Sequence, residues 1–110
     1  MPDRDGYPTN VELRRIRRWP INTGADCTAL LVFVRECWWN AEWGWTVAAR
    51  LRRERVGGTA YRLYQISTGG WSGNEDIIAA LDHNVMFQML CFDSHRRGGH
   101  YTYRVPEAMT

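Results

Sequence analysis

The sequence predicts a single α+β domain, in which a small antiparallel sheet, made of a hairpin plus a C-terminal strand, carries two or three helices on one face. Three observations predict this fold class. Helix-start signals precede apolar residues at helical spacing, a glycine pair separates two strand-like segments, and "HYTYRV" alternates polar and apolar residues. Because 110 residues suit one core, we assign residues 9–110 to one domain. Residues 1–8 contain two prolines, a glycine and alternating charge, so we assign them to a flexible arm.

The N-terminal part of the domain predicts two helices. Thr9 and Glu12 have capping-box spacing, and apolar residues then recur at helical intervals until Pro20, although the same stretch also alternates as a strand would. Thr23 and Asp26 give a second start signal before the run "ALLVFV", which suits either a buried helix or a buried strand. The length of this second segment favours a helix.

The middle of the chain predicts a β-hairpin. Residues 45–55 and 59–67 are rich in strand formers, and Gly57-Gly58 between them predicts a tight turn. One face of the hairpin is mostly apolar and the other carries arginines. We therefore expect one face to pack on helices while the other stays solvated.

The C-terminal part predicts one long helix and a final strand. Ser72 and Glu75 form another capping-box pair, and apolar residues at steps of three and four predict a helix from Asn74 to Phe92. This apolar stripe consists of Ile78, Leu81, Val85, Met89 and Phe92. After the turn-rich segment "SHRRGGH", the last strand ends at Pro106.

Composition limits the class of protein. All fourteen basic residues are arginine, which reflects either genome base composition or selection for phosphate and carboxylate binding, and the net charge of +2 alone does not predict a nucleic-acid binder. Cys27, Cys37 and Cys91 lack the spacing of a zinc site or a disulfide framework. The sequence also lacks the pattern of a signal peptide or a membrane span, so we expect a cytoplasmic protein with reduced thiols, no metal and no cofactor.

Two glycine-rich loops are the candidate ligand site. "STGGWSGNE" leads into a helix N-terminus, where free backbone N–H groups attract anions, and "RRGGHY" offers phosphate donors unless it is simply a solvated turn. Trp71 either stacks on a base or folds into the core. The predicted ligand-binding residues are Thr68, Gly69, Gly70, Trp71, Ser72, Gly73, Asn74, Arg96, Arg97 and His100. The loops begin at opposite ends of the long helix, so they meet only if the last strand returns beside it or a dimer forms.

A second candidate surface combines tryptophan and arginine. The tryptophans of residues 38–45 form either an aromatic platform for nucleic acid or a buried cluster, and the arginines of residues 14–18 form either a phosphate-binding stripe or an ordinary solvated face. The predicted partner-binding residues are Trp39, Trp43, Arg14, Arg15, Arg17 and Arg18.

Catalysis has weaker support. His83 is adjacent to Asp82 in a predicted helix, where neighbouring side chains diverge. Cys91 lies near His95 and His100, but no nucleophile motif accompanies it. We therefore assign no catalytic residue.

The strings "STGGWSGNE" and "RRGGHY" resemble a group of small uncharacterised proteins encoded by bacteriophages and prophages, over about residues 38–103. The resemblance implies a phage setting inside a host cell, and it brings no fold, activity or catalytic residue with it. We expect a non-catalytic binder of a nucleotide-like or other anionic ligand that counters host defence by sequestering a signal. The alternative is an inhibitor or adaptor that docks on a host defence protein or nucleic-acid complex. A hydrolase is a weaker third possibility, and a homodimer is compatible with all three.

Overall fold

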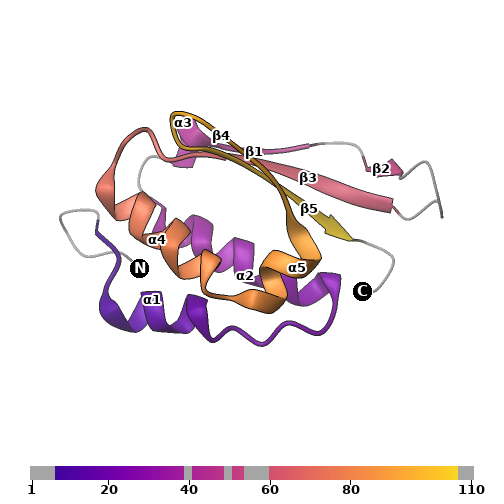
Figure 1. Ribbon diagram of the computed structural model, residues 1–110, viewed down its shortest axis with the longest axis horizontal. Coiled ribbons are helices and arrows are strands. Elements are labelled where there is room, and N and C mark those ends of the chain that lie inside the picture. Colours follow the sequence, from indigo (N-terminus) through magenta and orange to yellow (C-terminus); the bar gives the residue numbers. More distant parts are fainter. Residues whose placement is uncertain (1–6, 39–40, 49–50, 54–59, 107–110) are drawn as a thin grey trace.

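The computed structural model describes residues 7–38, 41–48, 51–53 and 60–106. These residues form two layers, an antiparallel sheet and a set of helices packed on one of its faces (Figure 1), which confirms the predicted α+β fold class. The helices are α1 (Asn10–Arg17), α2 (Gly24–Cys37), α3 (Ala41–Gly44), α4 (Ser72–Asp82) and α5 (Val85–Cys91). The strands are β1 (Trp45–Val47), β2 (Arg52–Arg53), β3 (Ala60–Ser67), β4 (Phe92–Arg96) and β5 (His100–Pro106).

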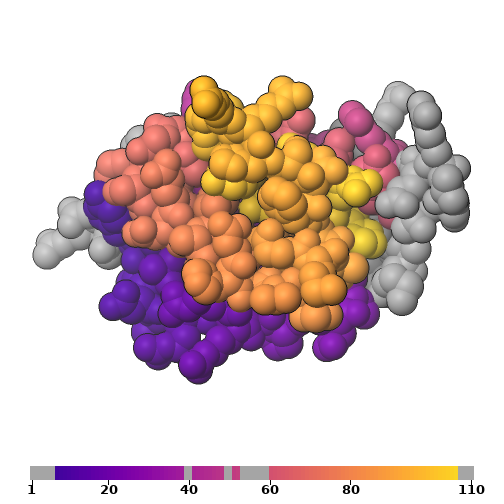
Figure 2. Space-filling model, viewed as in Figure 1, coloured from indigo at the N-terminus to yellow at the C-terminus, as the bar shows by residue number. Residues whose placement is uncertain are grey.

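The sheet is built around β3. Its strand order is β1-β3-β5-β4, and β2 also pairs with β3, further along the same edge as β1. The helices α1, α2, α4 and α5 lie below the sheet in Figure 1, whereas α3 lies at one end of it. In Figure 2 the same view shows α1 and α2 in indigo and purple at the bottom, α4 in salmon and α5 in orange across the middle, and β4 in deeper orange to gold above them.

The two N-terminal helices begin where the sequence predicts. The Thr9 hydroxyl accepts a hydrogen bond from the Glu12 amide at 3.2 Å, and the Glu12 carboxylate accepts one from the Thr9 amide at 2.8 Å. At α2 the Asp26 carboxylate accepts from the Thr23 amide at 3.1 Å. Both segments are therefore helices, which decides against the strand alternatives.

The predicted hairpin has one strand in two pieces. β1 and β2 both pair antiparallel with β3, but the intervening Ala48 and Leu51 lie outside either strand, so residues 45–55 do not form one continuous strand. The guanidinium of Arg62 donates to the Ala48 carbonyl at 2.7 Å, so a side chain occupies this acceptor beside the break. The predicted Gly57-Gly58 turn lies outside the described residues.

The prediction of one helix from Asn74 to Phe92 is wrong. The first helical segment ends at Asp82 with His83 as its C-cap, and Asn84 caps the next, because its Oδ1 accepts from the Phe87 amide at 3.2 Å. Its Nδ2 donates to the carbonyls of Ile16 at 3.0 Å and Trp19 at 3.1 Å. These two hydrogen bonds hold the Asn84 side chain against the N-terminal segment. The backbone leaves helical geometry at this point, and the side chain reaches both carbonyls.

The start of α4 also differs from the prediction. Trp71, not Ser72, is the N-cap residue, and no side chain caps this end. Ser72 is the first helical residue and its hydroxyl donates to the Tyr7 hydroxyl at 3.3 Å. The S-x-x-E spacing therefore marked the correct region but the wrong cap.

Strand β4 occupies a segment that the sequence predicted as a turn. β4 pairs antiparallel with β5, and the tight turn between them contains Gly98 and Gly99 with φ of 88° and 79°. The pairing is irregular between Phe92 and Ser94. β4 thus forms the edge of the sheet opposite β1.

The core lies between the sheet and the helices. It combines aliphatic residues of the helices with the helix-facing residues of β3 and β5, and Phe87 packs against Tyr103 with 5.1 Å between ring centroids. Its fully buried large side chains include Ile16, Leu30, Leu31, Val34, Ile66, Ile77, Leu81, Phe87, Tyr103 and Val105. Among the described helices, none has the length and apolar character needed to cross a membrane.

Candidate functional site

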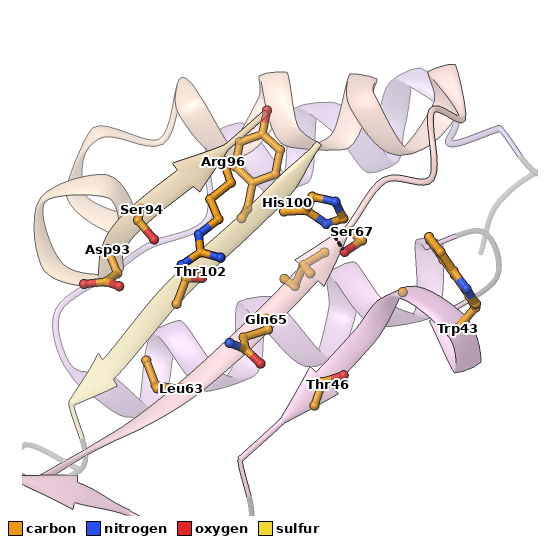
Figure 3. A pocket seen from close by; sticks show the side chains of 13 residues that line it. Trp43, Thr46, Leu63, Gln65, Ser67, Asp93, Ser94, Arg96, His100 and Thr102 are labelled. Carbon is orange, nitrogen blue, oxygen red and sulfur yellow. Dashed lines mark hydrogen bonds between the residues drawn. The ribbon is translucent and has the colours of Figure 1, made fainter. Parts of the chain in front are cut away.

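The helix-free face of the sheet, which we call the open face, contains a cavity of about 570 Å³. Figure 3 looks onto this face, with the helices behind the strands. Side chains from α3, β1, β3, β4 and β5 line the cavity, so it spans the four strands of the sheet order. The position of this site follows from the two-layer fold, because helices cover only the other face.

The floor of the cavity is polar because strand residues alternate between the two faces. In β3, Tyr64 and Ile66 are buried toward the helices, while Gln65 and Ser67 line the cavity. In β5, Tyr103 and Val105 are buried in the same way. The open-face lining residues with hydroxyl, amide or imidazole groups are Thr46, Gln65, Ser67, Ser94, His100 and Thr102.

Two large side chains stand on opposite sides of the floor. Trp43 on α3 is 64% exposed and lies beside β1, whereas Arg96 comes from β4 at the other edge. In Figure 3 the Arg96 side chain reaches back over the floor toward Thr102. The neighbouring tryptophans differ from Trp43, since Trp38 and Trp45 are buried and pack edge to face at 5.7 Å. The predicted tryptophan cluster is therefore divided between core and surface, and Trp39 lies outside the described residues.

A hydrogen bond fixes His100 at one end of the floor. Its Nδ1 is 2.7 Å from the Ser67 hydroxyl, which stands directly opposite in the β3–β5 pairing. When the hydroxyl donates to Nδ1, the ring proton is on Nε2, and that nitrogen becomes a donor. The Ser67–His100 pair can therefore present an N–H group of fixed orientation beside the cavity.

The charge of the cavity is balanced at one end and positive at the other. Asp93 forms an ion pair with Arg104, with 3.1 Å between Oδ1 and Nε. Arg96 lies on the same strand and also lines the cavity. An anionic group would therefore be favoured near Arg96 and His100, away from Asp93.

The predicted glycine loop does not line this cavity. Thr68 is buried and acts as a hydrogen-bond centre, because its carbonyl accepts from Trp71 N at 3.1 Å and from Asn74 Nδ2 at 3.3 Å. Its hydroxyl accepts from Gly70 N at 3.3 Å and donates to the Glu75 carboxylate at 3.4 Å. These bonds hold the loop together from within, with a carboxylate beside the helix start.

Trp71 packs on the N-terminal segment. Its ring centroid is 5.0 Å from that of Tyr7, and a side chain added at Gly73 would meet both rings. Trp71 is thus partly buried against another aromatic residue, which neither of the two sequence alternatives described. Gly69 is exposed beside Trp43, and Arg97 is exposed in the β4–β5 turn, outside the cavity lining.

The two glycine loops do meet. β5 runs antiparallel to β3, with Ser67 opposite His100, so the β4–β5 turn returns to the loop that follows β3. The Thr68 amide donates to the Gly99 carbonyl at 3.0 Å. The first of the two routes considered from sequence, the return of the last strand, therefore occurs within one chain.

The predicted arginine stripe lies far from the cavity. Arg14, Arg15, Arg17 and Arg18 are exposed on or beside α1, which Figure 1 places on the far side of the helical layer from the sheet. The Arg15 guanidinium lies over the rings of Phe33 at 4.4 Å and Trp19 at 5.1 Å. The stripe and Trp43 do not form one continuous surface.

The three cysteines are buried and free. Burial raises the pKa of the Cys37 thiol to about 11. A hydrogen bond with Cys27, together with burial, raises the pKa of Cys91. Neither thiol is suited to act as a nucleophile at neutral pH. The described part of the chain contains no cluster of three or more His, Cys, Asp or Glu residues that could hold a metal ion.

No family model, curated protein or solved structure matches this chain. The assignment of the cavity as the candidate site therefore depends on its geometry alone. The sequence motifs point to Arg96, His100 and Trp43, but not to the polar floor between them. The alternation in "HYTYRV" was the available signal, because it places His100 and Thr102 on the face opposite Tyr103 and Val105.

Proposed function

We propose that the protein binds an anionic, nucleotide-like small molecule on the open face of its sheet and does not chemically change it. One observation carries the proposal: a single polar cavity places an exposed indole, Trp43, across from a guanidinium, Arg96, and a fixed imidazole, His100. Aromatic faces bind bases by stacking, and arginine binds phosphate through two parallel hydrogen bonds.

Each part of the cavity suits one part of such a ligand. Trp43 offers a flat apolar surface to a base at the β1 side. Arg96 and His100 offer donors to phosphate oxygens at the opposite side. The hydroxyl and amide groups between them, such as Gln65 and Thr102, can bind sugar hydroxyls or base edges.

The surroundings of His100 favour binding over catalysis. In the described part of the chain its hydrogen-bond partner is Ser67, and a hydrolytic triad would need a further group to orient the ring. The buried thiols supply no alternative nucleophile. A binder without turnover lowers the free concentration of its ligand, which fits the sequestration of a host signal in the phage setting that we expect from the motif resemblance.

A second candidate function uses the same face for a nucleic-acid complex. Beyond the cavity the open face continues to Tyr61, over whose ring the Arg104 guanidinium lies at 5.3 Å. Aromatic and arginine side chains along an open sheet are typical of surfaces that bind single strands. This observation favours an oligonucleotide over a protein as the alternative partner.

Two adjacent arginines test the proposed site. Purified protein is screened by thermal shift against nucleotides, cyclic dinucleotides and a short oligonucleotide, because a ligand that prefers the folded state raises the melting temperature. With a nucleotide hit, Arg96→Gln should reduce affinity at least tenfold, since a charge-assisted hydrogen bond contributes about 1.5–3 kcal/mol. Arg97→Gln, which changes the same charge one residue away, should bind like the wild type because Arg97 is outside the cavity.

Two tryptophans give an independent comparison. Trp43→Ala should abolish the ligand-induced shift, whereas Trp71→Ala should preserve it, because Trp71 packs on Tyr7 outside the cavity lining. The opposite result in both pairs would return the site to the glycine loop and overturn the proposal. A shift with the oligonucleotide alone would favour the second candidate.

A further inference from the structure

The break between α4 and α5 leaves an apolar surface uncovered. Val85 and Met89 belong to the apolar stripe of the predicted long helix, but in the structure Met89 is 78% exposed and Met86 beside it is 54% exposed. Figure 2 shows this region in orange on the face toward the viewer. We call this surface the α5 patch, and it consists of Val85, Met86, Met89, Leu90 and Phe92.

Such a patch costs free energy in water and indicates a protein contact. Monomeric proteins rarely leave neighbouring large apolar side chains exposed, and methionine and aromatic residues are enriched at interfaces. The α5 patch holds two methionines and Phe92 within seven consecutive helical and strand residues. Its composition is that of an interface centre.

An unpaired sheet edge adjoins the patch. β4 is the end strand of the sheet order, so its outer backbone N–H and C=O groups have no neighbouring strand among the described residues. Phe92 belongs to both features, because it caps α5 and begins β4. An edge strand of this kind is a template for pairing with another strand.

We propose that two copies of this chain form a dimer in which β4 pairs antiparallel with the β4 of the partner and the two α5 patches pack together. The strand itself favours this occupant, because "FDSHR" carries Asp93 before its midpoint, Ser94, and His95 and Arg96 after it. Antiparallel pairing about Ser94 brings Arg96 of one strand beside the partner's Asp93, and both residues belong to the open face, whereas His95 stacks on Tyr101 on the helix-facing side. The strand is thus complementary in charge to a second copy of itself, as a twofold interface requires.

The geometry joins both features in one interface. The twofold axis of an antiparallel strand pair is perpendicular to the sheet, so the two helical layers lie on the same side and α5 of each copy faces its mate. A five-residue strand alone offers little contact area, and the α5 patch supplies the apolar area that a stable interface needs.

The dimer would also bring two cavities together. Asp93, Ser94 and Arg96 of β4 line the cavity, so a strand paired to β4 would extend the polar open face into a second copy. The proposal does not depend on what the cavity binds, because it rests on the β4 edge and the α5 patch.

Disulfide crosslinking tests the strand pairing directly. In Ser94→Cys, two thiols near the twofold axis would lie within disulfide distance, and mild oxidation should give a dimer on a non-reducing gel. The three native cysteines are buried and should not contribute. Thr46→Cys is the matched control, because Thr46 is also a hydroxyl residue on the open face but belongs to the opposite edge strand, β1. It should stay monomeric on the same gel.

Light scattering tests the patch. The wild type should have twice the 12.8 kDa mass of one chain. Met89→Glu should shift it to monomer, whereas Val32→Glu, at a 57% exposed site on α2, should remain a dimer. A wild-type monomer up to millimolar concentration would overturn the proposal. A dimer that survives Met89→Glu and is not crosslinked through Cys at position 94 would also overturn it, because its interface would lie elsewhere.

Discussion

At the scale of single residues, Gly99 shows how the two glycine loops depend on each other. Its φ is 79°, and a side chain built there would collide with the Thr68 hydroxyl. Gly70 has a similar φ of 75°, but a side chain there would meet nothing within 4 Å. The two positions share a positive φ, which strains any residue with a side chain, and they differ in what that side chain would contact.

This difference gives a prediction. Gly70→Ala should lower the free energy of unfolding by about 1–2 kcal/mol, the cost of a side chain at positive φ. Gly99→Ala should lower it by about 3 kcal/mol or more, because the collision adds to the strain. Urea unfolding of both variants measures the two values. Equal losses would show that the loops move apart freely and that the contact is unimportant.

The same residues show what sequence could and could not predict. The motif "RRGGHY" identified Arg96 and His100, since arginine and histidine beside a turn are typical phosphate donors. It could not distinguish Arg96 from Arg97, because that depends on where β4 ends: Arg96 is its last residue and lines the cavity, whereas Arg97 lies in the turn. Ser67 was not predicted as a site residue, because its hydrogen bond with His100 depends on the pairing of β3 with β5.

At the scale of elements, Asn84 is the residue that divides the predicted long helix. Local spacing predicted a continuous helix because the apolar stripe continues past residue 84. The side-chain amide instead bonds Ile16 and Trp19, which are more than sixty positions away in sequence. A pattern within one helix cannot contain that information.

Substitution of Asn84 should therefore destabilise the fold. Asn84→Ala should lower the free energy of unfolding by about 3 kcal/mol, because it removes an N-cap and leaves two backbone carbonyls without their donor. Asn84→Asp retains an N-cap acceptor but places a charge near the same two carbonyls, so it should be no more stable than Asn84→Ala. Chemical unfolding measures both. A stable Asn84→Asp variant would show that the cap, not the link to α1, carries the contribution.

At the scale of the whole molecule, the two layers and the antiparallel sheet followed from the order of the predicted elements. The hairpin and the final strand gave β3 and β5 correctly, since both alternate between buried and open faces. β4 was not predicted because "FDSHR" is short and polar and has no strand pattern of its own. It is a strand because it pairs with β5, which is information that the pattern of the segment alone does not contain. The cavity needs β4, so the site could be only partly predicted.

The dimer predicts a concentration dependence of hydrogen exchange. In concentrated protein, amides of β4 and α5 should exchange slowly, and dilution should speed their exchange as the dimer dissociates. Amides of β1, at the opposite edge, should not respond to dilution. Mass spectrometry of the corresponding peptides measures the difference. A uniform change across both edges would point to a general loss of stability.

The exposed position of Trp43 gives the protein an optical reporter. Trp38 and Trp45 are buried, and Trp19 and Trp71 are partly buried, so among the described tryptophans Trp43 should contribute the most red-shifted emission. It should also be the one that iodide quenches most readily. A molecule that stacks on this ring would shield it from the quencher, so occupancy of the cavity can be followed in unlabelled protein by fluorescence alone.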